Sequence, residues 1–255
     1  MNALFDVSNK VVLVSGGSRG IGEMIARGFV EAGASVIISS RKADACAALA
    51  AELSTIGSCR AVAANLALEA ECRRLIDDVA QSEGRLDVLV NNAGATWGAP
   101  MAEYDTAAFE RVFALNVQGL FHLTRFARPL LDASGSREAP SRVINIGSID
   151  GLRVPALETY AYSASKAAVH QLTRHLAREM APLVTVNAIA PGPFETKMMH
   201  ATIATFGEAI TNAAPLKRLG RPSDMAGSAI FLASPAASYI TGAIVPVDGG
   251  IATLA

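Results

Sequence analysis

A tyrosine and a lysine separated by one helical turn, Tyr162 and Lys166, could together transfer a proton. A four-residue step returns to nearly the same face of an α-helix, so the phenol and the ammonium would lie one above the other. A lysine cation favours the phenolate and turns a group with an ordinary pKa of about 10 into a usable acid. Many such pairs are only a solvated helix face, and the surrounding elements decide between the two interpretations.

A glycine-rich stretch near the start of the chain, SGGSRGIG, could hold a dinucleotide. Gly16, Gly20 and Gly22 follow an apolar run and lead directly into a helical pattern. Glycines allow a backbone to approach a pyrophosphate closely, and the N-terminus of the following helix supplies N–H groups and positive potential. A tight structural turn is the alternative. The position between a predicted strand and a predicted helix favours the dinucleotide site.

The end of the second apolar run predicts which dinucleotide binds. An NAD-binding chain is expected to carry Asp or Glu there for the ribose hydroxyls, but this sequence has Ser39, Ser40, Arg41 and Lys42. Arg41 and Arg19 of the glycine turn could instead neutralise a 2′-phosphate, which suits guanidinium geometry. The sequence therefore predicts NADP(H) rather than NAD(H), against the alternative of a solvated helix start.

The elements that position these residues alternate between short apolar runs and longer helical patterns. Such continuous apolar strands are buried on both faces, which is typical of a parallel sheet between helices. The predicted strands begin at Val11, Ser35, Arg60, Leu86, Arg142, Val184 and Ala243. Right-handed crossovers between them predict an α/β, doubly wound fold with ligands at the carboxyl ends of the strands. We expect one domain over residues 1–255, with a lid over about 193–216.

Composition excludes several classes of protein. The 255 residues are 51% hydrophobic and carry a net charge of −1, so no field attracts nucleic acid or an anionic membrane. The N-terminus lacks a signal peptide pattern, and no run is long enough for a membrane helix, so we expect a cytoplasmic protein. Neither a disulfide framework nor a metal site is predicted from its cysteines and histidines, which are Cys46, Cys59, Cys72, His122, His170, His175 and His200.

Four motifs together resemble the short-chain dehydrogenase/reductase family over essentially the whole chain. They are the glycine turn, NNAG at 91–94, YSASK at 162–166 and APGPFET at 190–196. The resemblance implies a single-domain Rossmann fold of seven parallel strands. It also implies a homotetramer, or a dimer, built partly on the helices that carry Asn116 and Tyr162.

The resemblance also implies roles for individual residues. Tyr162 is the expected general acid, Lys166 lowers its pKa and holds the nicotinamide ribose, Ser148 orients a carbonyl, and Asn116 stations a water for proton relay. The residues predicted to contact the cofactor, from the turn, the second strand and the resemblance together, are Gly16, Ser18, Arg19, Gly20, Ile21, Ser40, Arg41, Asn65, Leu66, Asn91, Ala93, Gly94, Tyr162, Lys166, Pro191, Gly192 and Thr196. Asn65 stands where many relatives have Asp, and its side-chain oxygen can still accept from an adenine amino group.

The chemistry of the residues agrees with ketone reduction. Hydride transfer builds negative charge on the carbonyl oxygen, so the site needs an acid and a further hydrogen-bond donor, which Tyr162 and Ser148 supply. Tyr160 is a second candidate acid, but it precedes Lys166 by six residues and turns about 240° away on a helix. Tyr162 is therefore the predicted acid.

The predicted lid suggests a hydrophobic carbonyl substrate. The apolar residues of this lid are Phe194, Met198, Met199, Ile203, Phe206 and Ile210, and Trp97 lies just after the NNAG motif. These side chains could line a substrate site or could pack the lid against its own domain. The sequence segments TWGA, RVINIGS and IAPGPF are most similar to those of the 3-oxoacyl reductase branch, particularly the reductases of rhamnolipid synthesis. A sugar or cyclic alcohol dehydrogenase and a non-catalytic NADPH-binding regulator are the alternatives.

Overall fold

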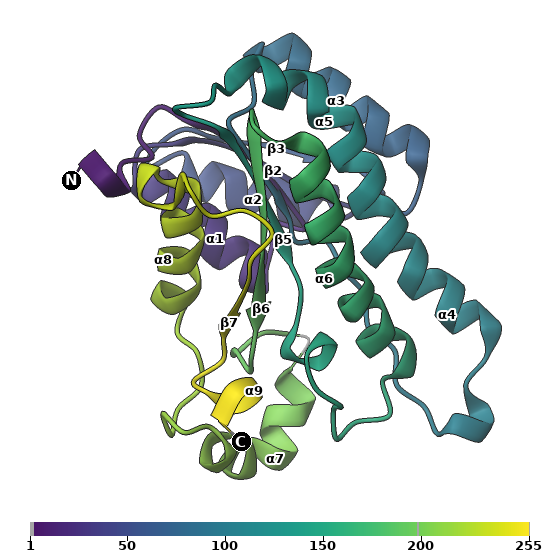
Figure 1. Cartoon of the computed structure of the whole chain (residues 1–255). Coiled ribbons are helices and arrows are strands. Elements are labelled where there is room, and N and C mark those ends of the chain that lie inside the picture. Colours follow the sequence, from purple (N-terminus) through teal and green to yellow (C-terminus); the bar gives the residue numbers. More distant parts are fainter. Residues whose placement is uncertain (1–2, 198, 255) are drawn as a thin grey trace.

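Seven parallel strands form one sheet in the order β3-β2-β1-β4-β5-β6-β7, seen in the computed structural model of Figure 1. The structure describes residues 3–197 and 199–254. The strands are β1 (Val11–Ser15), β2 (Ser35–Ser40), β3 (Cys59–Ala63), β4 (Val88–Asn91), β5 (Ser141–Ile146), β6 (Val184–Pro191) and β7 (Ile244–Val247). Each lies within two residues of its predicted range, which confirms the predicted parallel sheet.

Helices cover both faces of this sheet. The α-helices are α1 (Gly20–Glu31), α2 (Ala43–Leu53), α3 (Glu69–Glu83), α4 (Thr106–Phe113), α5 (Leu120–Ser134), α6 (Tyr160–Met180), α7 (His200–Ala213), α8 (Pro222–Ala233) and α9 (Ile251–Leu254). Short helical turns are η1 (Ala3–Phe5), η2 (Met101–Glu103), η3 (Ala114–Gly119), η4 (Ile149–Gly151) and η5 (Pro235–Ala237). Helices α1, α2 and α8 lie on one side, and α3, α5 and α6 lie on the other (Figure 1).

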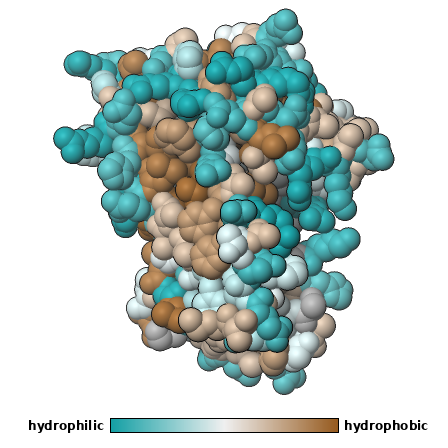
Figure 2. Space-filling view, turned by 90° about the vertical axis from the view of Figure 1, so that its right-hand side faces the viewer, coloured by the Kyte–Doolittle hydropathy of each residue, from teal (hydrophilic) through white to brown (hydrophobic). Residues whose placement is uncertain are grey.

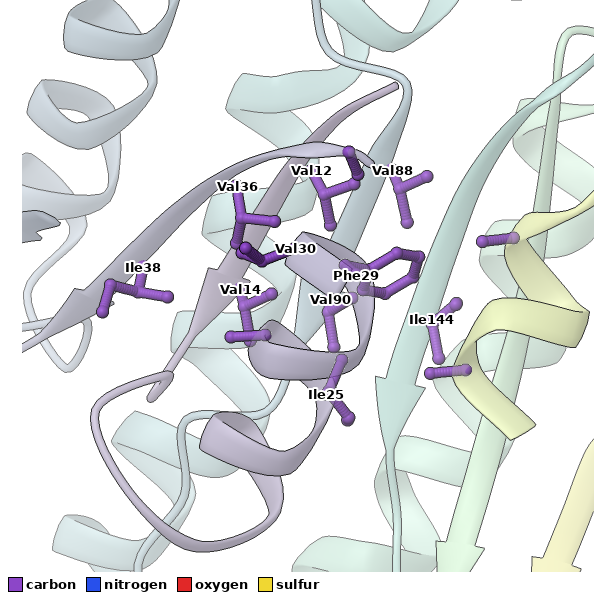
Figure 3. Packing of buried hydrophobic residues seen from close by; sticks show 14 of the residues in the cluster. Val12, Val14, Ile25, Phe29, Val30, Val36, Ile38, Val88, Val90 and Ile144 are labelled. Atoms are coloured by element: carbon purple, nitrogen blue, oxygen red, sulfur yellow. The ribbon is translucent and has the colours of Figure 1, made fainter. Parts of the chain in front are cut away.

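The two faces have separate hydrophobic cores because neighbouring strand residues point in opposite directions. Val12 and Val14 of β1 join the cluster beneath α1 and α8, whereas Leu13 joins the cluster beneath α3, α5 and α6. Figure 3 shows Ile25 and Phe29 of α1 packed against the first of these surfaces. Fully burying one such side chain contributes about 1.5–3 kcal/mol, so this packing fixes the start of α1 above the sheet.

The chain reverses direction across the sheet between β1 and β4, which are neighbours although β2 and β3 intervene in sequence. In open α/β sheets, ligands bind outside the carboxyl ends of strands at such a switch point. The connections after β1, β4, β5 and β6 all leave from this edge, at the bottom of Figure 1. The fold therefore brings together the glycine turn, NNAG and YSASK.

The predicted lid contains α7, with non-helical backbone angles at Phe206. Its two ends are joined by a bridge between Phe194 and Gly220, and the Phe194 ring is 2% exposed. Phe194 therefore belongs to the core, whereas Phe206 is exposed. Met198 lies outside the described residues. Within the described ranges, none of the helices has the length and apolar character needed to cross a membrane.

Candidate active site

The glycine turn is shaped by two close backbone approaches. Gly16 has φ +64°, in the left-handed region where glycine is favoured. A Cβ on Gly22 would lie 2.3 Å from the Gly16 carbonyl oxygen, so a side chain cannot be accommodated there. The turn leads into the N-terminus of α1, where Arg19 occupies the N-cap position without a side-chain cap to a described residue. The N–H groups at this end are suited to an anionic group.

Two residues that the sequence analysis did not select hold this turn against β4. The Asn92 amide donates to the carbonyl oxygens of Ser15 and Gly16, both at 3.0 Å. The Ser15 hydroxyl accepts from the backbone N–H groups of Asn92 and Ala93 and donates to the Val90 carbonyl. The sequence signals that could have identified these residues were the position of Asn92 within NNAG and the position of Ser15 at the end of the first predicted strand.

Cationic side chains flank the predicted cofactor site. Arg19 and Arg41 are exposed, and neither forms an ion pair with any residue that the structure describes. Arg19, Gly20 and Thr196 also line a groove of about 930 Å³ between α1, α7 and α8. Neither guanidinium group is engaged by a carboxylate of the described residues, so both are available to an anionic phosphate and the residues present fit NADP(H).

Several predicted contacts can be made only by the backbone. The Asn91 side chain donates to Thr124 and Asn145 inside the sheet–helix interface, and the Leu66 side chain is 4% exposed within the core. These two side chains therefore support the site and do not face it. Asn65 is half-buried, and its Oδ1 accepts a long 3.4 Å hydrogen bond from the Ala67 N–H, which leaves acceptor capacity for an adenine amino group.

The remaining predicted cofactor residues lie around the same edge. Gly192 passes close to Asp248, because a Cβ on Gly192 would lie 2.6 Å from the Asp248 Cβ. The Thr196 side chain lies over Gly20, where a Cβ would be 3.3 Å from the Thr196 methyl group. The segment predicted as a lid therefore begins next to the glycine turn. Ser18, Ile21 and Ser40 are half-buried beside that turn and at the end of β2, and Pro191 is buried at the end of β6.

Tyr162 and Ser148 meet at the carboxyl end of β5. Ser148 follows this strand and caps η4 by accepting from the Asp150 N–H at 3.1 Å. The phenol of Tyr162, in the first turn of α6, lies near enough to Ser148 for a side-chain hydrogen bond between them to lower its pKa. The fold brings these two side chains together, so one carbonyl oxygen could receive hydrogen bonds from both hydroxyl groups.

Lys166 lies one turn below Tyr162 and is 5% exposed. Its Nζ donates to the Ile146 carbonyl oxygen at 2.7 Å and lies 5.5 Å from the centre of the Tyr162 ring. A Cβ on Gly94 would lie 3.7 Å from Nζ, so the glycine of NNAG leaves space beside the ammonium. Burial lowers the pKa of Lys166 to about 8, although the charge of Asp150 opposes this shift.

The pKa of the phenol differs from the expectation that Lys166 lowers it. Burial raises the pKa of Tyr162 to about 12, the hydrogen bond with Ser148 acts in the opposite direction, and the charge of Asp150 raises it further. Desolvation is the largest of these effects, and the Lys166 Nζ is directed to the Ile146 carbonyl. The phenol therefore stays protonated at neutral pH, which is the form that an acid requires.

Asn116, in the π-helical segment η3, links the connection after β4 to α6 through hydrogen bonds. Its Oδ1 accepts from the Ala95 N–H at 2.8 Å, and its Nδ2 donates to the Ala95 carbonyl and the Ser165 hydroxyl, both at 2.9 Å. Ser165 in turn donates to the Tyr162 carbonyl at 2.7 Å. Both amide hydrogens are used in these bonds, so a relay water at Asn116 would have to bind an oxygen atom of this residue.

His170 lies one further turn along α6 and is 3% exposed. Its ring fits between Gly147 and Gly151, where a Cβ would lie 2.2 Å and 2.9 Å from ring atoms. Neither ring nitrogen has a hydrogen-bond partner among the described residues. Burial lowers the pKa of His170 to about 4, and the Lys166 charge contributes to this shift. A neutral imidazole therefore supports the backbone on both sides of Ser148.

This burial predicts a loss of stability in acid. Between pH 6.5 and pH 4 the unfolded chain protonates His170 and the folded chain does not, so the free energy of unfolding falls as the pH falls. Denaturant unfolding at pH 7 and pH 5 should show a loss of about 2 kcal/mol that His170→Leu removes. The exposed His175, on the same helix, is the control. An equal acid loss in wild type and His170→Leu would contradict this prediction.

Comparisons with known proteins agree with this geometry. Residues 16–252 match the family model described as enoyl-(acyl carrier protein) reductase. The rhamnolipids biosynthesis 3-oxoacyl-(acyl-carrier-protein) reductase of Pseudomonas aeruginosa is 46% identical over 253 residues, which cover 98% of this chain and 99% of the relative. Galactitol 2-dehydrogenase (L-tagatose-forming) of Cereibacter sphaeroides is 38% identical and covers 97% of this chain, with 96% of its own length matched.

A solved structure matches closely as well. The Pseudomonas aeruginosa RhlG/NADP active-site complex superimposes with a TM-score of 0.95 at 46% identity, and the match covers 99% of this chain and 100% of that chain. The architecture and the order of the site elements are therefore those of a known group of oxidoreductases.

Proposed function

This chain belongs to the short-chain dehydrogenase/reductase family, and we propose that it is an NADPH-dependent reductase of 3-oxoacyl or similar hydrophobic ketones. It is an oxidoreductase, as its relatives are. The observation that carries the proposal is the meeting of Ser148, Tyr162 and Lys166 at the carboxyl end of β5, beside the glycine turn.

In the proposed mechanism, bound NADPH supplies a hydride to the carbonyl carbon of the substrate. Ser148 donates a hydrogen bond to the carbonyl oxygen, which polarises the bond before transfer. Tyr162 gives its proton to the same oxygen, so that the carbonyl becomes a secondary alcohol. Lys166 stabilises the resulting phenolate and returns a proton to it, a task that a pKa of about 8 suits near neutrality.

Exposed apolar side chains around the site support a hydrophobic substrate. Large side chains of this kind lie on each of the three connections that follow β4, β5 and β6, and they are Trp97, Met101, Leu152, Val154, Leu157, Phe206 and Leu216. Val154 is 90% exposed, and such residues at a site edge are typical of contact surfaces for apolar ligands. This rim suits an acyl chain better than a polyol.

A substrate panel tests the proposed substrate class. We expect NADPH consumption with 3-oxoacyl thioesters, and we expect kcat/KM to rise as the acyl chain lengthens, because each buried methylene contributes about 0.8 kcal/mol. A hexulose and cyclohexanone serve as the comparison substrates. Faster reduction of either of these would favour a sugar or cyclic alcohol dehydrogenase. NADPH binding without turnover of any carbonyl would favour a regulator.

A homotetramer, or a dimer, is a further part of the proposal. Figure 2 shows apolar side chains gathered in the middle of the face that lies over α4, α5 and α6, bordered by hydrophilic ones. Exposed aromatic residues on these helices include Phe109, Phe121 and Tyr160. A face of this kind is suited to a second copy of the chain. Light scattering that finds a monomer at micromolar concentration would contradict this part of the proposal.

A cytoplasmic location also remains a proposal. Cys46, Cys59 and Cys72 are free, and Cys46 and Cys72 are buried. Unpaired thiols of this kind are typical of a reducing compartment. Fractionation that recovers the protein outside the cytoplasm would contradict it.

A further inference from the structure

One tyrosine hydroxyl joins the connection after β4 to the helix that carries the predicted acid. The Tyr104 hydroxyl, beside η2, accepts a hydrogen bond from the Ala161 N–H at 3.2 Å. It also donates to the Trp97 carbonyl oxygen at 3.1 Å. A phenolic hydroxyl can donate one hydrogen bond and accept others, so both contacts form at once.

The contact with Ala161 satisfies a group that the helix leaves unpaired. The first four N–H groups of an α-helix have no partner within the helix. Thr159, the N-cap of α6, makes no side-chain cap with any described residue, and Ala161 is fully buried. A buried N–H without an acceptor costs about 1–3 kcal/mol, so the Tyr104 hydroxyl acts as a cap from another part of the chain. The residue after this capped position is Tyr162.

The contact with Trp97 restrains the connection after β4 on the other side of the site. Trp97 is partly exposed on the connection after β4, and the Arg111 guanidinium lies 4.9 Å from its ring centre. The Tyr104 ring is itself held edge-on between Tyr160 and Phe109, with ring centres 5.3 Å and 5.5 Å away. Aromatic pairs of this geometry restrict ring movement, so the hydroxyl has a fixed place.

We propose that Tyr104 is a positioning residue, whose hydroxyl sets the place of Tyr162 relative to the Trp97 connection during carbonyl reduction. The inference rests on the proposed function for its effect on turnover. Its contacts within the described part of the chain are with Trp97, Phe109, Tyr160 and the Ala161 N–H, and none of them is with the four predicted catalytic side chains. Small displacements of an acid from the reacting oxygen reduce the rate strongly, whereas most of the predicted cofactor contacts lie on the glycine turn and at the ends of β2, β4 and β6.

The test is a pair of matched substitutions. Tyr104→Phe removes the bridging hydroxyl and keeps the ring, and Tyr160→Phe removes a hydroxyl from the adjacent ring of the same cluster. Tyr160 is 40% exposed, and its hydroxyl has no hydrogen bond to the described residues. With a 3-oxoacyl thioester, Tyr104→Phe should lower kcat roughly tenfold, with KM and the Kd for NADPH changed less than threefold. Tyr160→Phe should behave as wild type.

Two results would overturn the proposal. One is equal kcat in Tyr104→Phe and Tyr160→Phe. The other is a general weakening in Tyr104→Phe, in which Tm and NADPH affinity fall together with kcat, because that pattern indicates a purely structural role.

Hydrogen exchange separates this test from the proposed function. If wild type reduces no thioester, the proposed function fails. Hydrogen exchange at the backbone amides of residues 159–163 still tests whether the Tyr104 hydroxyl positions the start of α6. Faster exchange there in Tyr104→Phe than in Tyr160→Phe supports the bridge, and equal exchange in the two variants overturns it.

Discussion

Replacing Tyr162 with phenylalanine should lower kcat for 3-oxoacyl thioester reduction about 1,000-fold, as expected for the loss of a positioned general acid. Burial raises the pKa of Tyr162 to about 12, so the phenol carries its proton at every pH at which the enzyme would be assayed. The variant keeps the ring and loses only the hydroxyl that we propose as the proton donor. Ser148 would then be the remaining donor to that oxygen.

Cofactor binding separates this loss from misfolding. We expect the Kd for NADPH of Tyr162→Phe to stay within about threefold of wild type, because the variant removes one predicted cofactor contact and leaves the glycine turn and the two arginines unchanged. Tyr160→Phe is the matched control, since it removes a hydroxyl two residues away on the same helix. A variant Tyr162→Phe with near-normal turnover, together with an inactive Tyr160→Phe, would show that the acid was misassigned.

Replacing Arg41 with alanine should raise the KM for NADPH roughly 10- to 100-fold and leave the KM for NADH nearly unchanged. A hydrogen bond to a charged group contributes about 1.5–3 kcal/mol, and only NADPH carries the 2′-phosphate. Arg41 is exposed and lies directly after β2, where no carboxylate is present to hold a ribose hydroxyl. The measurement is initial rate against each cofactor at saturating substrate.

The control for Arg41 is a cation of the same type at the opposite edge of the sheet. Arg137 is exposed in the connection before β5, so Arg137→Ala changes the net charge equally without altering the cofactor edge. We expect it to leave both KM values unchanged. Equal weakening of NADPH and NADH binding in Arg41→Ala, or tighter NADH than NADPH binding in wild type, would contradict a phosphate contact.

The order of the elements could be predicted from sequence because each strand is a continuous apolar run between helical patterns. Val11–Ser15 is buried at all five positions, which is the condition that makes a parallel strand recognisable. The glycine turn was equally readable, since Gly16 and Gly22 occupy positions where a side chain would collide with backbone. Both signals depend on neighbours in sequence.

Side-chain direction could not be predicted in the same way. Asn91 ends β4 as expected, but its amide points between the sheet and the helices, because strand residues alternate in direction. Phe194 reads as a lid residue and is instead core, since Gly220 leaves room for its ring. These outcomes depend on which surfaces the fold brings together.

Neither the pKa of Tyr162 nor the hydrogen bonds of the Tyr104 hydroxyl could be predicted from the sequence, for the same physical reason. The phenol pKa depends on the water that burial removes, and a four-residue spacing carries no information about that. The bridge joins residues 97, 104 and 161, which come from the connection after β4 and the start of α6. Long-range contacts of this kind follow from tertiary packing and leave no local pattern.

The most direct test of the central claim is the loss of NADPH absorbance when purified protein meets a medium-chain 3-oxoacyl thioester, measured side by side for wild type and Tyr162→Phe. The predicted result is consumption of one NADPH for each secondary alcohol formed by wild type, with almost none in the variant. Equal rates in the two proteins, or NADPH binding with no reduction of the thioester, would contradict the assignment of this site as a Tyr162-dependent 3-oxoacyl reductase.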